Sequence, residues 1–149
     1  MLSSCENFLV SFAPPEYGGI SLKKRELYFD TTNIIRKFVL EKKHFNEYIL
    51  KIYIPISGNT NNSINTSTQL VMLIDRYNAF ALYPQFMPRL VECYVDSYAK
   101  ISAFEVQYEL TNESISALSN ARYLELQINQ NQFLYGKVNN LTSLRNFFW

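Results

Sequence analysis

The strongest constraint on how this chain folds is a period-two alternation of apolar and polar residues. In residues 48–56 every second side chain is apolar, as at Leu50 and Ile52, and residues 101–110 repeat the pattern around Phe104. Successive side chains of a β-strand point to opposite faces of the sheet, so this alternation is typical of strands with one face on a core. The sequence therefore predicts long antiparallel strands.

Several shorter segments are also typical of strands. Residues 75–78 have turn chemistry between residues 69–74 and 79–83, which predicts a β-hairpin. Residues 31–41 fit either a helix or a strand, and their β-branched content favours the strand. The remaining predicted strands are residues 8–12, 21–29, 90–98, 122–129 and 133–138.

Two short helices are predicted in the last third of the chain. Thr111 can cap a helix that continues with Ile115 and Leu118 at helical spacing, and Asn140 can cap residues 141–148. Strands followed by a helix, a hairpin and a helix imply a mainly-β or α+β fold. We expect an antiparallel sheet or sandwich with one or two short helices in the C-terminal third.

Length and composition point to a single domain over residues 1–149. The chain is 48% hydrophobic and 15% aromatic and contains only 4 glycines, so it can build a β-rich core. Residues 57–68 contain almost nothing that could be buried and are predicted to form an exposed, mobile loop. Residues 1–6 are predicted to act as a tether.

The charge balance argues against nucleic acid as a partner. The chain has 14 basic and 13 acidic residues, and neither half is lopsided. The basic pairs and runs between residues 23 and 43 are interspersed with acids, so we expect them on a solvated face. No stretch approaches the roughly 20 apolar residues that a membrane-spanning helix needs.

Catalytic, metal and cofactor motifs are not evident in the sequence. His44 lies in a charged segment that gives no reason to expect an aligned nucleophile, and the metal-binding CxxC and HxxxH spacings do not occur. A carboxylate-based enzyme would have to use Asp75, Glu105 or Glu109. Turn chemistry explains Asp75, and the polar face of an amphipathic strand explains the two glutamates. We therefore predict no catalytic residue, no metal and no cofactor.

Exposed tyrosines are candidates for a contact surface. Tyrosine offers a large amphipathic area at low entropic cost and is enriched at interfaces. The predicted partner surface consists of Tyr53, Tyr77 and Tyr83, with Asn61 and Asn65 from the loop at residues 57–68. Half-buried strand tyrosines are the alternative interpretation of the same residues.

The first residues carry a resemblance that bears on location. Leu2-Ser3-Ser4-Cys5 resembles the lipobox that ends a bacterial lipoprotein signal peptide. The resemblance implies a lipid on Cys5 as the means of membrane attachment, and a location in the cell envelope. Cys93 would then remain as an inert buried thiol, whereas an oxidising compartment would also permit a bridge between Cys5 and Cys93.

The resulting hypothesis is a non-enzymatic envelope lipoprotein domain that binds or scaffolds another envelope component, such as a protein. Two alternatives remain at the level of the sequence. One is a cytoplasmic protein-interaction or immunity-type module that acts by surface contact or by oligomerisation through an edge strand. The other is the small carboxylate enzyme. The sequence alone does not predict the oligomeric state.

Overall fold

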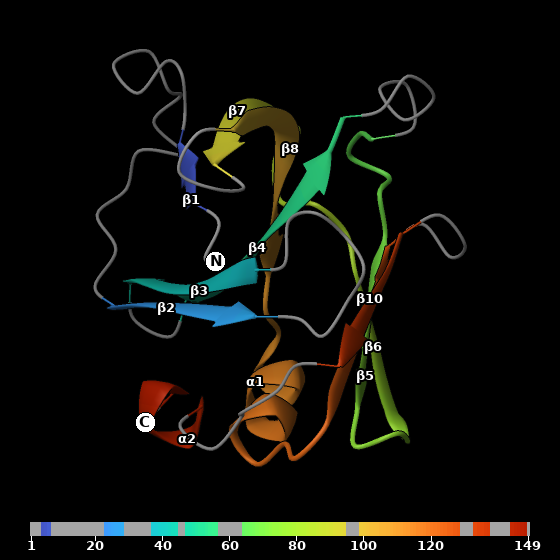
Figure 1. Ribbon diagram of the computed structural model, residues 1–149. Helices are drawn as coiled ribbons and strands as arrows, with labels where there is room; N and C mark the ends of the chain where they lie inside the picture. Colours follow the sequence, from blue (N-terminus) through green and yellow to red (C-terminus); the bar gives the residue numbers. More distant parts are fainter. Residues whose placement is uncertain are drawn as a thin grey trace.

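The computed structural model contains two antiparallel sheets and two short helices (Figure 1), which confirms the predicted fold class. Both helices lie in the C-terminal third of the chain. The structure describes residues 4–6, 23–28, 37–44, 47–56, 64–94, 99–128, 133–137 and 144–148.

The larger sheet has six strands in the order β1-β7-β8-β4-β3-β2. The long pair β4 and β8 lies at its centre, and β2 and β1 form its edges. The strands are β1 (Ser4–Glu6), β2 (Lys23–Tyr28), β3 (Lys37–His44), β4 (Glu47–Pro55), β7 (Arg89–Tyr94) and β8 (Lys100–Glu109).

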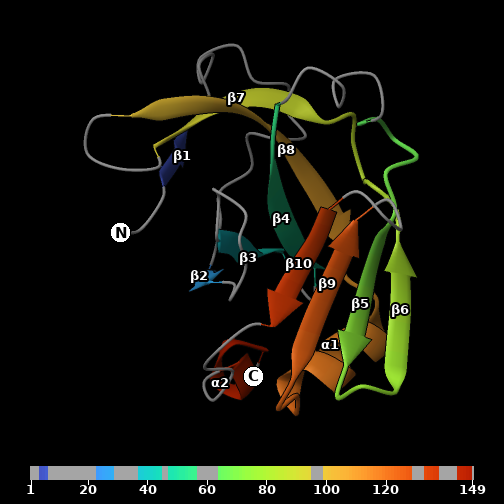
Figure 2. The ribbon, with the colours of Figure 1, turned by 45° about the vertical axis from the view of Figure 1, so that its right-hand side comes forward.

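The smaller sheet has four strands in the order β10-β9-β5-β6, which places β6 at one edge (Figure 2). Its strands are β5 (Leu70–Ile74), β6 (Asn78–Leu82), β9 (Leu124–Ile128) and β10 (Phe133–Lys137). The helices are α1 (Asn112–Ser119) and α2 (Leu144–Phe148). Thr111 caps α1 as predicted, since its hydroxyl accepts a hydrogen bond from the Ser114 N–H at 3.2 Å.

The main core lies between the two sheets. The alternating apolar residues of β4 and β8, such as Ile52 and Val106, belong to the same buried cluster as Met72 and Leu126 of the smaller sheet. Full burial of one such side chain stabilises the fold by about 1.5–3 kcal/mol, so this cluster is the main source of stability. The helices extend the cluster at one end, where the Tyr48 hydroxyl donates to the Phe148 carbonyl at 3.0 Å.

Each predicted strand in the described residues is confirmed as a strand, although the ends of some predicted ranges, such as residues 122 and 123, lie outside the observed strands. Residues 37–41 belong to β3, which confirms the strand interpretation for that part of the ambiguous segment. The predicted hairpin is the antiparallel pair of β5 and β6. The predicted strand at residues 8–12 and residues 31–36 lie outside the described residues, as do 95–98 and the predicted cap Asn140.

The prediction that residues 57–68 are exposed is wrong at the end of that segment. Ile64 is buried in the main core, and Thr68 is fully buried. The Thr68 hydroxyl accepts a hydrogen bond from the Asn65 N–H at 2.8 Å, and its carbonyl accepts one from the Tyr108 hydroxyl at 2.9 Å. Hydrogen bonding is therefore what allows a polar residue to be buried here. Residues 57–63, which include Asn61, lie outside the described residues.

The expectation of a solvated charged face is also wrong for part of the six-stranded sheet. Glu41 is only 3% exposed, and it lies between the buried ammonium groups of Lys43, at 2.9 Å, and Lys51, at 3.1 Å. Glu41 and Lys43 are two residues apart and share a face of β3, while Lys51 comes from the neighbouring β4. We name these three residues the Glu41 ion cluster.

Electrostatics in the Glu41 ion cluster favour the ionised form of Glu41. Burial by itself would raise the pKa of Glu41, but the ammonium groups of Lys51 and Lys43 outweigh it and hold this pKa below its ordinary value of 4.5. The carboxylate is therefore ionised at neutral pH. Strand alternation predicted the shared face correctly, but it cannot distinguish a solvated polar face from a buried, paired one.

Candidate functional site

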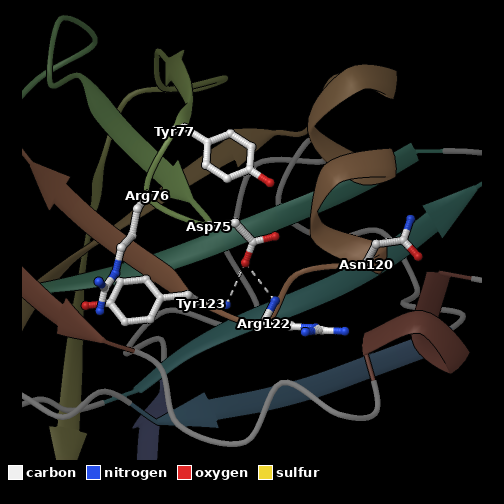
Figure 3. Close-up of a pocket in the computed structure, with 6 residues that line it drawn as sticks. All are labelled: Asp75, Arg76, Tyr77, Asn120, Arg122 and Tyr123. Carbon is white, nitrogen blue, oxygen red and sulfur yellow. Dashed lines mark hydrogen bonds between the residues drawn. The ribbon is translucent and has the colours of Figure 1, made fainter.

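A pocket lies where the turn between β5 and β6 meets the connection from α1 to β9 (Figure 3). Its volume is about 450 Å³, which is within the usual range for small-molecule sites of about 300–1,000 Å³. We call it the hairpin pocket. The residues that line it are Asp75, Arg76, Tyr77, Asn120, Arg122 and Tyr123.

The turn that forms one wall has an uncommon backbone. Asp75 and Arg76 have positive φ angles of 52° and 69°, and among the described residues they are the non-glycine residues with this conformation. Hairpin turns of type I′ require positive φ at both central residues and usually place Asn, Asp or Gly there. Aspartate tolerates the left-handed region, whereas arginine at such a position carries a steric cost of about 1–2 kcal/mol.

Asp75 fixes the turn to the neighbouring strand. Its Oδ1 atom accepts hydrogen bonds from the backbone N–H groups of Arg122, at 2.9 Å, and Tyr123, at 3.0 Å. Its own N–H donates to the Tyr123 carbonyl at 2.9 Å. These three bonds connect residues far apart in sequence, so they hold the two walls of the hairpin pocket together.

The side chains on the walls combine positive charge with aromatic surface. The Arg76 guanidinium stacks over the Tyr123 ring at 4.6 Å from its centroid, and the Tyr123 hydroxyl donates to Glu125 Oε1 at 2.9 Å. Tyr77 is 79% exposed, and both Arg76 and Arg122 are exposed. Within the described part of the chain, neither guanidinium forms a salt bridge.

This arrangement is suited to binding. Guanidinium groups present forked donors that match carboxylates, and tyrosines offer both a flat apolar face and a hydroxyl. Asp75 is the carboxylate among the lining residues, and its Oδ1 already accepts two backbone hydrogen bonds. The geometry therefore accommodates a small polar ligand that carries hydroxyl and carboxylate groups.

The residues predicted to form one partner surface do not all lie on the surface of the protein. Tyr77 and Tyr83 are exposed, by 79% and 60%, and Tyr77 lines the hairpin pocket. Asn65 stabilises its own turn, because its side-chain oxygen accepts from the Ser67 N–H at 2.7 Å. Tyr53 is only 5% exposed, so the prediction that it belongs to a partner surface is wrong. Burial, with the Glu105 carboxylate to which it is hydrogen-bonded, raises the pKa of Tyr53 well above 10.0.

The three carboxylates considered for an enzyme do not share a pocket. Glu105 is buried, which corrects the expectation of a solvated residue, and its Oε1 contacts Arg89 Nη2 at 2.9 Å. Glu109 accepts a hydrogen bond from Gln85 at 3.3 Å. Both belong to β8 of the larger sheet, whereas Asp75 belongs to the hairpin of the smaller one.

The described residues also lack a cluster of three or more histidine, cysteine or acidic side chains that could hold a metal ion. His44 is the last residue of β3. Within the described residues there is also no helix long and apolar enough to cross a membrane.

The two cysteines are brought opposite each other. Cys5 of β1 is the register partner of Cys93 of β7, and Cys93 is fully buried and disulfide-bonded. Directly opposed residues of antiparallel strands have Cβ atoms about 4.5–5.5 Å apart, close to the spacing that a disulfide needs. The prediction of Cys93 as a free thiol is therefore wrong. The lipid on Cys5 stays a prediction, and it would compete with the bridge for the same sulfur.

Sequence reasoning considered Asp75, Tyr77 and Tyr123 as candidates but missed Arg76, Asn120 and Arg122 of the hairpin pocket. Arg76 lies inside the predicted turn, where a charged residue in place of glycine was the available signal. Arg122 and Tyr123 reach the pocket only because Asp75 binds their backbone N–H groups. That contact spans 47 and 48 residues, and no local pattern encodes it.

Fold and pocket together define a two-sheet β domain with an open, polar and aromatic pocket at the tip of a hairpin. No family model matches the sequence, and neither the curated proteins nor the solved structures include a significant match.

Proposed function

We propose that this protein is a non-enzymatic binding domain of the bacterial cell envelope that recognises an envelope component through the hairpin pocket. The observation that carries the proposal is the Arg76 side chain, which lines the pocket from a positive φ angle of 69°. Glycine adopts this conformation without steric cost, so an arginine here gives up stability. Local strain of this kind is concentrated at functional sites.

The lining residues favour an acidic sugar as the ligand class. The guanidinium groups of Arg76 and Arg122 can pair with a carboxylate, and the Asn120 amide can hydrogen-bond to hydroxyl groups. Tyr77 and Tyr123 add flat surface against which an apolar ring face can pack. Peptidoglycan fragments combine these groups in a single envelope molecule, which makes them the appropriate first probe.

The disulfide at Cys93 supports an oxidising location, because disulfides form and persist outside the cytosol and are rare within it. The lipobox-like segment Leu2-Ser3-Ser4-Cys5 supports only the alternative, in which Cys5 carries a lipid and is not bridged. A sulfur atom in a disulfide cannot also carry a thioether-linked lipid, so we propose the bridge as the state of Cys5. A lipid anchor at Cys5 is the competing proposal for the same compartment.

Arg76→Gly is expected to weaken ligand binding while leaving the fold intact. Relief of the left-handed backbone, about 1–2 kcal/mol, offsets the glycine entropy cost and the lost stacking on Tyr123, each about 0.5–1 kcal/mol. The free energy of unfolding should therefore change by less than about 1 kcal/mol. Calorimetric titration with a purified disaccharide muropeptide should show wild-type binding and a roughly 10- to 100-fold loss in the variant, as for a lost charge-assisted hydrogen bond.

Two further variants sharpen this test. Arg122→Ala removes the second guanidinium but keeps the backbone N–H that Asp75 accepts, so it should weaken binding by a similar factor. Lys24→Ala removes an exposed cation from β2 and should bind like the wild type. A wild-type protein that does not bind the muropeptide, or equal binding by all variants, would reject the pocket as the ligand site.

Thiol counting is expected to show no free thiol in protein purified from the bacterial envelope after expression from its native gene. Alkylation followed by mass spectrometry should label both cysteines only after reduction, and reduction should lower the free energy of unfolding by about 2–4 kcal/mol. A lipid mass on Cys5 would favour the anchor over the bridge. Two thiols that react without reduction would reject the oxidising location.

A further inference from the structure

Among the residues that the structure describes, no strand pairs with the outer edge of β6 in the smaller sheet. β6 is the last strand in the sheet order, and Figure 2 shows it as the outermost strand. Its residues Asn78–Leu82 include no charge, no proline and no bulge. The outer edge β2 of the larger sheet differs, since four of its six residues, Lys23 to Glu26, are charged. Charges and prolines are the usual means by which proteins protect sheet edges from pairing.

Exposed side chains continue along this edge. Ala79 and Ala81 are exposed, and the large side chains of Tyr77 and Tyr83 flank them at 79% and 60% exposure. Because strand side chains alternate, Ala79 and Ala81 lie on the outer face of the sheet, while Tyr77 and Tyr83 directly precede and follow β6. Phe80 points the other way and is only partly buried against the main core. An added strand would therefore find small residues in the middle of the edge and aromatic residues at its ends.

The sequence of this edge is nearly a palindrome, Tyr-Asn-Ala-Phe-Ala-Leu-Tyr over residues 77–83. An antiparallel copy centred on Phe80 would set Phe80 opposite Phe80, Ala79 opposite Ala81 and Tyr77 opposite Tyr83. Aromatic cross-strand pairs stabilise antiparallel sheets, and small residues opposite each other do not clash. Because the segment is uncharged, self-pairing brings no like charges together.

We propose that β6 pairs with β6 of a second copy of this chain, in antiparallel orientation and centred on Phe80, to form a two-fold symmetric dimer. The occupant follows from the chemistry of the edge. Within the described residues no strand pairs with the outer side of β6, so its backbone groups can accept an extended strand. The near-palindrome of residues 77–83 makes a second copy of β6 the strand that fits. Two four-stranded sheets join into one continuous sheet. In such an isologous contact both copies use the same surface, the β6 edge. The contact is therefore complete in the dimer and does not extend into a filament.

The dimer is independent of ligand binding at the hairpin pocket but adjoins it. Tyr77 lines the pocket and is also the first residue of the palindrome. The register places Tyr83 of the second copy next to it. Each pocket in the dimer therefore gains a further aromatic residue, in addition to its own Tyr77 and Tyr123.

Charge-swapped variants test the proposed register directly. In a variant with Ala79→Lys and Ala81→Lys, each lysine faces a lysine of the second copy, and a variant with Ala79→Glu and Ala81→Glu repeats this with acids. Analytical ultracentrifugation should show a dimer for the wild type and a monomer for each variant. An equimolar mixture of the two variants should form a heterodimer, because lysine then faces glutamate.

The control carries the same two added charges away from the edge. Thr66→Lys with Ser67→Lys places them on the exposed turn before β5 and should leave the dimer intact. Circular dichroism and thermal unfolding establish that each variant is folded before its mass is interpreted. A monomeric wild type, or a lysine variant that still dimerises, would overturn the proposal. Failure of the muropeptide titration would leave it untouched, because that titration reports on the pocket alone.

Discussion

Replacement of Glu41 by glutamine is expected to lower the free energy of unfolding by about 3–5 kcal/mol, the usual cost of removing one partner from a buried ion pair. Glu41 contacts both Lys43 and Lys51 at 2.9 and 3.1 Å, and all three side chains are less than a tenth exposed. The variant keeps the shape of the side chain but leaves two buried ammonium groups without this carboxylate. Urea unfolding followed by circular dichroism measures the loss.

The same variant should have a specific pH signature. The pKa of Glu41 lies below its ordinary value of 4.5 in the folded protein, so the ionised group contributes stability that is fully present above pH 4.5. This contribution disappears as the pH falls through the folded-state pKa, because the carboxyl becomes protonated in both states. The difference in stability between wild type and Glu41→Gln should therefore be constant near neutral pH and shrink below pH 4.5.

A triple variant separates the charge effect from packing. Glu41→Leu, Lys43→Met and Lys51→Met together remove all three charges of the Glu41 ion cluster at once, and apolar replacement of whole ion clusters is often neutral or stabilising. We expect the triple variant to recover most of the stability that Glu41→Gln loses. If both variants were equally destabilised, packing rather than charge would account for the loss. A loss below about 1 kcal/mol in Glu41→Gln would mean that the cluster behaves like a surface pair.

The Glu41 ion cluster also shows where the sequence stops predicting the structure. Alternation along β4 and β8 predicted which residues share a face, and burial of Leu50 and Val106 follows that pattern. The opposite face carries Lys51 and Glu105, which the same pattern assigns to solvent. Both are buried because their partners come from neighbouring strands, and strand pairing is a tertiary property. Polar residues at period two mark a face, but they do not reveal what covers it.

One wall of the hairpin pocket, the turn between β5 and β6, was predictable from the sequence. Residues 75–78 carry turn chemistry, and the structure contains the expected hairpin with Asp75 and Arg76 at positive φ. The opposite wall could not be predicted, because it depends on one carboxylate oxygen that meets two backbone N–H groups. The palindrome centred on Phe80 is visible in the sequence alone. It indicates self-pairing only once β6 is known to be an edge strand, because a strand inside a sheet already has a partner on each side.

Tyr108→Ala is expected to destabilise the fold by about 3–5 kcal/mol, as for other large aromatic residues removed from a core. Tyr108 is fully buried on β8, and its hydroxyl donates to the Thr68 carbonyl at 2.9 Å. This bond connects the larger sheet to the residues that precede β5. Because β5 leads into the hairpin that carries both the pocket and the β6 edge, the loss should also increase hydrogen exchange in β5 and β6.

Two other tyrosine variants show how much of the stability lost in Tyr108→Ala comes from the hydroxyl hydrogen bond and how much from packing of the ring. Tyr108→Phe keeps the ring and removes only the hydroxyl bond, so it should cost about 1–2 kcal/mol. Tyr83→Ala removes a tyrosine that is 60% exposed in the single chain and, at concentrations where the protein is monomeric, should change stability by less than about 0.5 kcal/mol. The difference between the two Tyr108 variants then measures ring packing. If Tyr108→Phe lost as much as Tyr108→Ala, the bond to Thr68 would be the main contribution of Tyr108 to stability, and the two sheets would be held together here by hydrogen bonding more than by the core.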